Sequence, residues 1–217
     1  MTADLFERVA DLRPSREAMA EGAVLLRGLA RPVEADLIAD LRDIVAQAPF
    51  RHMVTPGGHQ MSVAMTNCGP LGWVTDRTGY RYDARDPLAA KPWPAMPRSF
   101  RELAAQAADQ AGFGRFAPDA CLINRYQPGA RMSLHQDKDE DDFGAPIVSV
   151  SLGLPAIFLF GGLKRGDKAR RFRLAHGDVV VWGGPARLAF HGVAPLADGE
   201  HASVGRQRIN LTFRKAG

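Results

Sequence analysis

The chain has 217 residues, of which 46% are hydrophobic and 24% are charged, a balance typical of a folded protein with one sizeable core. Residues 1–10 include two acids and no apolar run, so we expect no secretory signal peptide, and no stretch is long enough to cross a membrane. Cys68 and Cys121 lack the spacing of a disulfide framework, which predicts buried thiols in a cytoplasmic protein. The net charge of +4 is compatible with nucleic-acid binding but does not demonstrate it.

The first half of the chain predicts two helices separated by irregular structure. A short strand is expected at 23–29, and apolar residues recur with helical spacing over 34–48. Residues 50–91 are rich in glycine, proline and threonine and also carry methionines and aromatic residues, which indicates short strands and loops. A second helix follows the proline-rich residues 92–97, with a capping box at Ser99 and Glu102 and Gly112 as its end.

From residue 120 onward the pattern is that of short strands separated by Gly, Pro and Asp turns. The expected strands are 120–127, 147–153, 156–160, 171–175, 179–182, 188–191 and 208–214. Seven strands at this spacing favour a sandwich or jelly roll. We therefore predict a mainly β (α+β) protein, a single domain over 1–217, with N-terminal helices and a catalytic jelly roll from about 115 to 217.

Three residues have the composition of a metal site. His135 and Asp137 are two apart, so on a strand they share one face, and His191, expected to end strand 188–191, is the best third ligand. Two histidines and one carboxylate suit Fe(II), because they leave positions open for a cosubstrate and O2, whereas structural zinc prefers four ligands. The pair alone is a weak motif; the alternative is a surface turn followed by a solvated charged loop at 138–142.

Strand 208–214 alternates strictly between apolar and polar residues. The polar face is either that of an edge strand in water or the wall of a barrel mouth, where two arginines bind carboxylates. Asn124 and Tyr126 share a face of strand 120–127 and could hydrogen-bond such a carboxylate. A 2-oxo-dicarboxylate needs both ends fixed, and the chain supplies one arginine for each end. The polar residues of the alternating strand are Arg208, Asn210, Thr212 and Arg214.

Four segments together resemble the AlkB family of Fe(II)- and 2-oxoglutarate-dependent dioxygenases: residues 124–126, 133–139, 191–192 and 208–214. The resemblance extends into residues 53–97 and covers about 20–217. It implies a double-stranded β-helix that uses Fe(II), 2-oxoglutarate and O2. It implies that the iron ligands are His135, Asp137 and His191. It also implies that the far carboxylate of 2-oxoglutarate is held by Asn124, Tyr126 and Arg208, and the metal-chelating end by Asn210 and Arg214.

The resemblance also makes residues of about 50–91 a nucleotide-recognition lid. It implies that an extruded base would be contacted by Met65, Trp73, Tyr80, Asp139 and Arg165. A methyl group on N1 of adenine or N3 of cytosine makes the base cationic and weakens its pairing, which favours extrusion and stacking on indole. The alternative for the two aromatic residues is ordinary core packing. One departure is His59, where the family pattern leads us to expect tyrosine.

These inferences predict a DNA-repair enzyme that oxidatively demethylates 1-methyladenine and 3-methylcytosine in single-stranded DNA. The reaction would convert 2-oxoglutarate to succinate and release formaldehyde. Double-stranded DNA and RNA stay open as further substrates, and we expect a monomer without membrane association. Two alternatives are an Fe(II)/2-oxoglutarate hydroxylase acting on a protein or small molecule, and a non-catalytic nucleic-acid-binding β domain.

Overall fold

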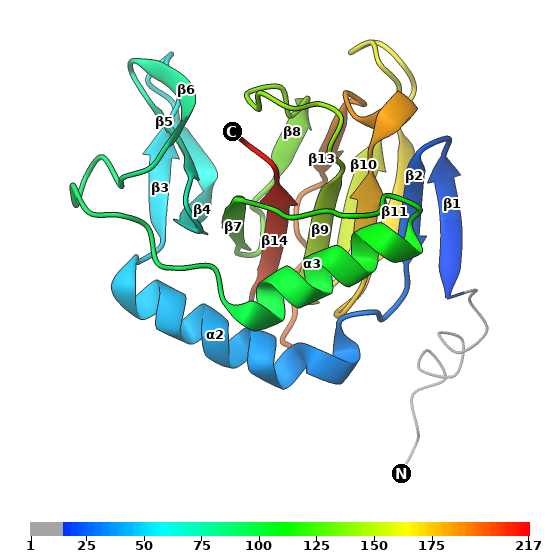
Figure 1. The fold of residues 1–217 in the computed structure, drawn as a ribbon, viewed down its shortest axis with the longest axis horizontal. Helices are drawn as coiled ribbons and strands as arrows, with labels where there is room; N and C mark the ends of the chain where they lie inside the picture. Colours follow the sequence, from blue (N-terminus) through cyan, green and yellow to red (C-terminus); the bar gives the residue numbers. More distant parts are fainter. Residues whose placement is uncertain (1–14) are drawn as a thin grey trace.

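The computed structural model describes residues 15–217, which form two layered sheets, a separate hairpin and two α-helices (Figure 1). The helices are α2 (Glu34–Gln47) and α3 (Arg98–Gln110), with short 3-10 turns η1 (Arg31–Val33) and η2 (Gly184–Ala186). The strands are β1 (Arg16–Ala20), β2 (Ala23–Leu26), β3 (Arg51–Val54), β4 (Gln60–Cys68), β5 (Gly72–Asp76), β6 (Gly79–Asp83), β7 (Ala120–Tyr126), β8 (Met132–His135), β9 (Ile147–Gly153), β10 (Ala156–Phe160), β11 (Arg170–Leu174), β12 (Val179–Trp182), β13 (His191–Val193) and β14 (Arg208–Arg214).

The larger sheet has eight strands in the order β1-β2-β12-β9-β14-β7-β4-β3, and the smaller has four in the order β11-β10-β13-β8. Helices α2 and α3 cover the outer face of the larger sheet, while the smaller sheet lies against its other face (Figure 1). The central strands of the larger sheet are therefore buried on both faces. This is the predicted jelly roll, or double-stranded β-helix, with strands β5 and β6 forming a hairpin outside both sheets.

Two hydrophobic cores follow from the alternation of side chains along these strands. On β14, Ile209, Leu211 and Phe213 face the helices, where the ring of Phe213 packs edge-on against Phe100 of α3 at 5.8 Å. On β12, Trp182 belongs instead to the core between the sheets. Burying an apolar side chain in such a core contributes about 1.5–3 kcal/mol. Because successive side chains of a strand point to opposite faces, alternate residues of the larger sheet belong to the two different cores. On β14 this alternation directs the polar residues toward the second sheet.

Most of the predicted elements are confirmed, and two strands were missed. Helix α2 and strands β7, β9, β10, β11, β12 and β14 lie where the sequence predicts them, within a residue at the ends, whereas β2 ends at Leu26 and not at the predicted residue 29. Helix α3 ends as expected: Gly112 has a φ of +91°, and the Phe113 N–H donates to the Ala108 carbonyl at 2.8 Å. Strands β1 and β8 were not predicted, because each is short and lacks a clear apolar alternation.

The predicted capping box is wrong. Helix α3 begins at Arg98, with Pro97 in an extended conformation as its N-cap and no side-chain cap hydrogen bond. Ser99 therefore lies inside the helix, and its hydroxyl donates to the Asp40 carboxylate of α2. The fixed φ of proline starts the helix earlier than the motif suggests, and Ser99 links the two helices instead.

The strand predicted at 188–191 is displaced. His191 begins β13 rather than ending a strand, and residues 188–190 form the connection from η2. The two cysteines are free and buried as predicted, and Cys68 on β4 stands opposite Cys121 on β7. Among residues 15–217, no helix is long and apolar enough to cross a membrane.

Candidate metal and cosubstrate site

Strand β14 lies between β9 and β7 in the middle of the larger sheet, and all seven of its residues are buried. The edge-strand interpretation of 208–214 is therefore wrong. Asn210, Thr212 and Arg214 of its polar face line a cavity of about 1000 Å³ between the two sheets. The same cavity is lined by the three expected metal ligands and by the β5–β6 hairpin. Backbone pairing sets this wall, because Arg208 stands opposite Tyr126 and Asn210 opposite Asn124.

The structure brings the three predicted metal ligands together at one end of the smaller sheet. His135 ends β8 and His191 begins β13, directly opposite each other in the strand pairing. The Asp137 carboxylate lies between them: its Oδ1 is 3.6 Å from Nε2 of His135, and its Oδ2 is 3.7 Å from Nε2 of His191. One ligand atom from each of the three residues lies within 4.8 Å of the others, which is compatible with a single metal ion.

The backbone fixes which nitrogen each histidine offers. Nδ1 of His135 hydrogen-bonds the Ser133 carbonyl at 2.8 Å, and Nδ1 of His191 hydrogen-bonds the Ala189 carbonyl at 3.0 Å. A carbonyl only accepts, so both Nδ1 atoms carry hydrogen and both Nε2 atoms keep a free lone pair toward Asp137. Gly192 permits this approach, since a Cβ there would lie 2.7 Å from the Met132 carbonyl oxygen of β8.

The electrostatics of the cluster also suit a cation. Burial, helped by the neighbouring His135, lowers the pKa of His191 to about 4. The imidazole is therefore neutral near pH 7, as a metal ligand must be. Burial raises the pKa of Asp137, but the charge and hydrogen bonds of Arg214 outweigh burial and hold that pKa well below its usual range. The carboxylate is ionised and available.

Behind the cavity wall formed by Tyr126 and Asn210, Arg208 is a buried cation with no carboxylate partner among residues 15–217. Its side chain is 1% exposed, its guanidinium lies 5.0 Å from the centre of the Tyr126 ring, and Nη2 donates to the Ser151 hydroxyl at 2.9 Å. Its Nε and Nη1 have no hydrogen-bond partner among residues 15–217. Burial lowers the pKa of Arg208, since the charge lacks a counterion. Unpaired buried donors are costly, so this site fits a carboxylate that binds from solution.

The remaining predicted cosubstrate residues divide into two groups. Arg214 donates to Oδ2 of Asp137 at 2.6 Å, while its Nη1 lacks a partner in the described part of the chain, as does Oδ1 of Asn124. Asn210 is engaged: its amide donates to the Ser149 hydroxyl at 2.8 Å and the Val150 carbonyl at 3.0 Å. Direct contact between Asn210 and a cosubstrate carboxylate would require one of these bonds to be exchanged.

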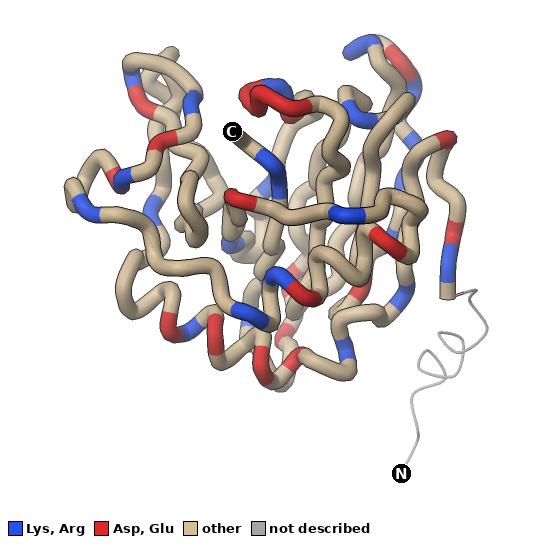
Figure 2. The backbone as a smooth tube through the Cα atoms, viewed as in Figure 1, with Lys and Arg blue, Asp and Glu red and all other residues tan. Residues whose placement is uncertain are grey.

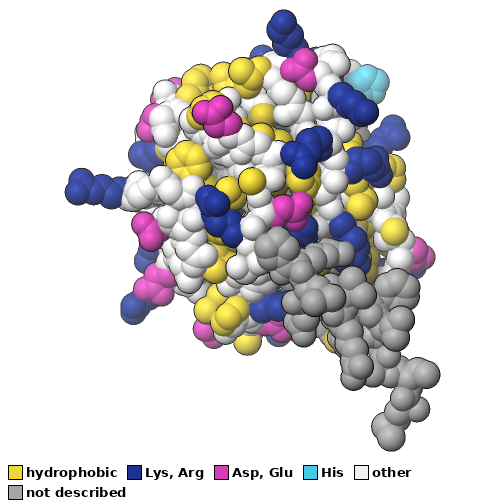
Figure 3. All heavy atoms as spheres, turned by 90° about the vertical axis from the view of Figure 1, so that its right-hand side faces the viewer, with side chains coloured by type: hydrophobic (Ala, Val, Ile, Leu, Met, Phe, Trp, Pro, Cys, Tyr) yellow, Lys and Arg dark blue, Asp and Glu magenta, His cyan; other side chains and the backbone are white. Residues whose placement is uncertain are grey.

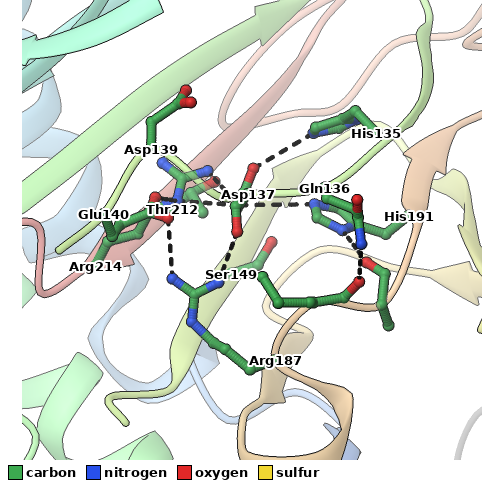
Figure 4. A network of polar contacts seen from close by, with 12 residues as sticks. His135, Gln136, Asp137, Asp139, Glu140, Ser149, Arg187, His191, Thr212 and Arg214 are labelled. Atoms are coloured by element: carbon green, nitrogen blue, oxygen red, sulfur yellow. Dashed lines mark hydrogen bonds and ion pairs between the residues drawn. The ribbon is translucent and has the colours of Figure 1, made fainter. Parts of the chain in front are cut away.

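A buried ionic network beside the metal cluster was missed by the sequence reasoning (Figure 4). Glu140 lies in the run 138–142, which was expected to be a solvated loop, but its side chain is 2% exposed. It accepts hydrogen bonds from Tyr82 of β6 at 2.6 Å and Arg187 at 3.0 Å, and it lies 3.3 Å from Nε of Arg214. Arg187 also donates to the Asp137 carbonyl at 2.8 Å, so the network fixes the metal loop. One acid in a run of five charged residues carries no sequence signal of burial.

Replacing Glu140 by alanine is expected to destabilise the fold by about 3–5 kcal/mol, because Arg187 would be left buried without a carboxylate. Urea unfolding should show a lower midpoint with an unchanged slope. Tyr82→Phe is the matched control, since it removes only one hydrogen bond to the same carboxylate and should cost about 1 kcal/mol. A loss in Glu140→Ala no larger than in the control would contradict the network.

The predicted base-contacting residues gather at the mouth of the same cavity. Trp73 donates from its indole nitrogen to the Asp139 carboxylate at 2.8 Å, and its ring stacks with that of Tyr80 at 5.7 Å. Tyr80 is 50% exposed, so core packing does not explain this pair. Met65 is buried in the cavity wall opposite Asn124, and Arg165 lies over the Phe190 ring at 5.3 Å on the other side of the mouth. His59 also lines the cavity.

Known proteins are similar to this chain in sequence and in fold. Residues 22–214 match the model of the 2OG-Fe(II) oxygenase superfamily. The chain is 61% identical over 214 residues to the alpha-ketoglutarate-dependent dioxygenase AlkB of Escherichia coli (strain K12), covering 99% of this chain and 98% of that protein. It is 28% identical over 158 residues to the tRNA demethylase abh1 of Schizosaccharomyces pombe, covering 67% and 52% of the two chains. The solved structure of OsALKBH1 superposes with a TM-score of 0.81 at 28% identity, covering 92% of this chain and 99% of that one.

The superfamily match spans the strands that carry His135 and His191 and the buried arginines of β14. The match to the Escherichia coli protein spans almost the whole of both sequences. This chain therefore belongs to the AlkB family of Fe(II)- and 2-oxoglutarate-dependent dioxygenases.

Proposed function

We propose that this dioxygenase repairs DNA by removing methyl groups from N1 of adenine and N3 of cytosine in single strands. The observation that carries the proposal is the pairing of Trp73 with Asp139 at the mouth of the cavity that holds the metal cluster. An indole face and an adjacent carboxylate favour a flat cation, which is what these methylated bases are. The similarity to a tRNA demethylase and to AlkB supports a nucleic-acid substrate.

As a 2OG-Fe(II) oxygenase, the enzyme uses Fe(II), 2-oxoglutarate and O2. We assign the iron to His135, Asp137 and His191, whose two Nε2 atoms and ionised carboxylate form the donor set. Arg208 is assigned to the far carboxylate of 2-oxoglutarate, because two of its buried donors lack partners in the described chain. Iron with its two cosubstrates supplies the capacity to hydroxylate a C–H bond. The protein's own residues orient the two substrates and exclude water.

We also assign Asn124 and Tyr126 to the far carboxylate of 2-oxoglutarate, since both lie on β7, the strand that pairs with β14 beside Arg208. Arg214 and Asn210 are assigned to the metal end, where the Asn210 amide would exchange one of its bonds to Ser149 and Val150 for a bond to 2-oxoglutarate. These assignments place the cosubstrate along β14, between the deep arginine and the metal cluster.

The base would enter between the β5–β6 hairpin and the metal cluster. Trp73 and Tyr80 would stack on it, Asp139 would stabilise its positive charge, and Met65 and Arg165 would contact it from the cavity wall and rim. Hydroxylation of the N-methyl carbon gives an N-hydroxymethyl base, which releases formaldehyde and leaves the unmodified base. We propose residues of about 50–91 as the nucleotide-recognition lid of one dioxygenase domain over 1–217, with the jelly roll at about 115–217.

The test is formaldehyde release from a single-stranded oligonucleotide containing 1-methyladenine, with Fe(II), ascorbate and 2-oxoglutarate each omitted in turn. Release that matches succinate formation and requires both iron and 2-oxoglutarate is the expected result. Succinate formed without formaldehyde would keep the iron site and contradict this substrate. The same assay on 3-methylcytosine, on duplex DNA and on RNA ranks the substrates that the site chemistry leaves open.

Replacing Trp73 by alanine is expected to abolish demethylation of the oligonucleotide while sparing the slow, uncoupled conversion of 2-oxoglutarate. The indole contacts the base site but none of the three metal ligands. Thr78→Ala, on the exposed turn of the same hairpin, is the control and should retain both activities. Full activity of Trp73→Ala would contradict the base site and favour a hydroxylase acting on a protein or small molecule.

We further propose that the enzyme acts as a cytoplasmic monomer. Its buried free thiols support a reducing compartment, and the candidate metal ligands and the Arg208 site all come from one chain, which supports a monomer. Light scattering at micromolar concentration should give the mass of one chain, and a stable dimer would contradict this assignment.

A further inference from the structure

Nearly all of the net positive charge of the chain is concentrated in ten residues. Residues 164–173 contain six basic residues and one acid, a charge of +5, whereas the whole chain carries +4. The other 207 residues therefore sum to −1. An arginine-rich composition would spread this charge over the chain, so the concentration calls for a local explanation. We call the six residues the basic strip: Lys164, Arg165, Lys168, Arg170, Arg171 and Arg173.

All six residues of the basic strip are exposed, and none forms an ion pair with a carboxylate among residues 15–217. Elsewhere in residues 15–217, seven arginines are paired with carboxylates, such as Arg81 with Asp76 and Arg206 with Asp198, and no other segment of ten residues gathers six basic residues. The single acid of the segment, Asp167, accepts a hydrogen bond from the Lys164 backbone N–H at 3.0 Å and so holds the turn of the loop. The charge of the strip is thus available to a partner.

The basic strip starts at the cavity mouth and leads away from it. Arg165 lines the cavity and lies over Phe190, which fixes the near end of the strip. The loop 161–169 rises above β10 and β11 on the side opposite the β5–β6 hairpin (Figures 1 and 2). Figure 3 shows Lys and Arg side chains gathered on the upper part of the side of the molecule that bears β11.

Strand β11 arranges the far end of the strip. Phe172 and Leu174 point into the core between the sheets, so Arg171 and Arg173 point outward on one face. The two arginines are about 7 Å apart along the strand, because each residue advances about 3.3 Å. Both side chains lack hydrogen bonds within the described chain, so neither is required to hold the fold.

We propose that the basic strip binds the phosphodiester backbone of the single strand that carries the target base, continuing the nucleic-acid path beyond the cavity mouth. This inference rests on the proposed function and adds an interaction surface to it. Phosphates at successive positions of an extended strand would pair with Arg171 and Arg173, while Lys164, Arg165 and Lys168 lead the strand from the mouth. Exposed guanidiniums are well suited to phosphate oxygens, and the interaction carries no base specificity.

The arginines of β11 could have a simpler role, protection of the sheet edge. Strand β11 is the edge of the smaller sheet, and charged residues on an edge prevent pairing with other chains. Edge protection requires charge only on β11 itself and predicts no binding of nucleic acid. The unpaired lysines of the loop, outside β11, favour the phosphate-binding role.

The experiment compares wild type with Arg171→Ala/Arg173→Ala, using a 1-methyladenine oligonucleotide of about 15 nucleotides, within the range of single-strand site sizes. Affinity is measured against salt concentration. Each phosphate contact on a single strand contributes a slope of about 0.7, so the double variant should lower the slope by about 1.4. Demethylation of a methylated trinucleotide, too short to reach β11, should be unchanged. Arg42→Ala/Arg98→Ala, which removes two exposed arginines from α2 and α3, is the control for net charge.

Equal slopes for the two double variants would overturn the proposal and leave edge protection as the role of the strip. A lower slope seen only with duplex DNA would also overturn it, because the partner would then be the complementary strand. Failure of the wild-type enzyme to demethylate the trinucleotide and the longer strand would instead contradict the proposed function, while the binding slopes would still decide the role of the strip.

Discussion

Replacing Asp137 by alanine is expected to abolish both iron-dependent turnover and tight binding of Fe(II). Asp137 is the only carboxylate of the three-residue cluster, and an imidazole binds a metal as the neutral ring, so the two histidines that remain cannot offset the charge of the metal. Changes to groups that merely orient a metal ligand typically cost about 10- to 100-fold in affinity, so loss of the ligand itself should cost more. Anaerobic titration with Fe(II) and measurement of succinate formation test the two effects separately.

Asp139→Asn is the matched control for the Asp137 variant. Asp139 lies two residues further along the same loop and contacts Trp73 rather than the metal cluster. It should keep iron binding and uncoupled 2-oxoglutarate turnover while losing activity on a cationic base. Wild-type iron affinity in Asp137→Ala would show that the cluster is not the metal site.

Replacing Arg208 by methionine is expected to raise the KM for 2-oxoglutarate by at least about 30-fold. Removal of one partner from a buried charge pair costs about 2–5 kcal/mol, and each 1.4 kcal/mol corresponds to about tenfold in affinity. The same variant should be as stable as wild type, or more stable, in the absence of 2-oxoglutarate. Its methionine replaces a buried guanidinium whose Nε and Nη1 lack partners in residues 15–217.

These two effects of Arg208→Met distinguish a binding role from a structural one. Added 2-oxoglutarate should raise the melting temperature of the wild type, since ligand at about 100 times its Kd contributes about 2.7 kcal/mol. That rise should disappear in the variant. Arg208→Lys keeps the charge but loses the planar guanidinium, so its KM and its rise in melting temperature should lie between those of wild type and Arg208→Met. An unchanged KM in Arg208→Met would contradict the assignment of the far carboxylate.

The sequence by itself determined the β-rich fold, most of the strands and the chemistry of the site. The alternation along 208–214 needs only the two-residue period of a strand to place its arginines on one face, and the structure confirms that face. The sequence also proposed the three candidate metal ligands, because His135 and Asp137 are close in sequence and His191 was the best-placed of the remaining histidines.

Tertiary structure decided where these faces lie and which groups meet. The sequence pattern of β14 is the same for an edge strand in water and a central strand at a cavity; only its pairing with β9 and β7 excludes the first. His135 meets His191 because β8, which was not predicted, pairs with β13. Burial of Glu140 requires Arg187 and Tyr82 from distant segments, and a charge run alone predicts solvation.

The surface charge also divides into what the sequence predicts and what only the fold decides. Composition gave a net charge with little meaning by itself, whereas the fold shows that the basic strip is exposed, unpaired within the described chain and continuous with the cavity mouth. Local periodicity fixes the direction of a side chain, because it depends on backbone geometry within a few residues. Partners across strands and sheets depend on contacts distant in sequence, and these arise only when the chain has folded.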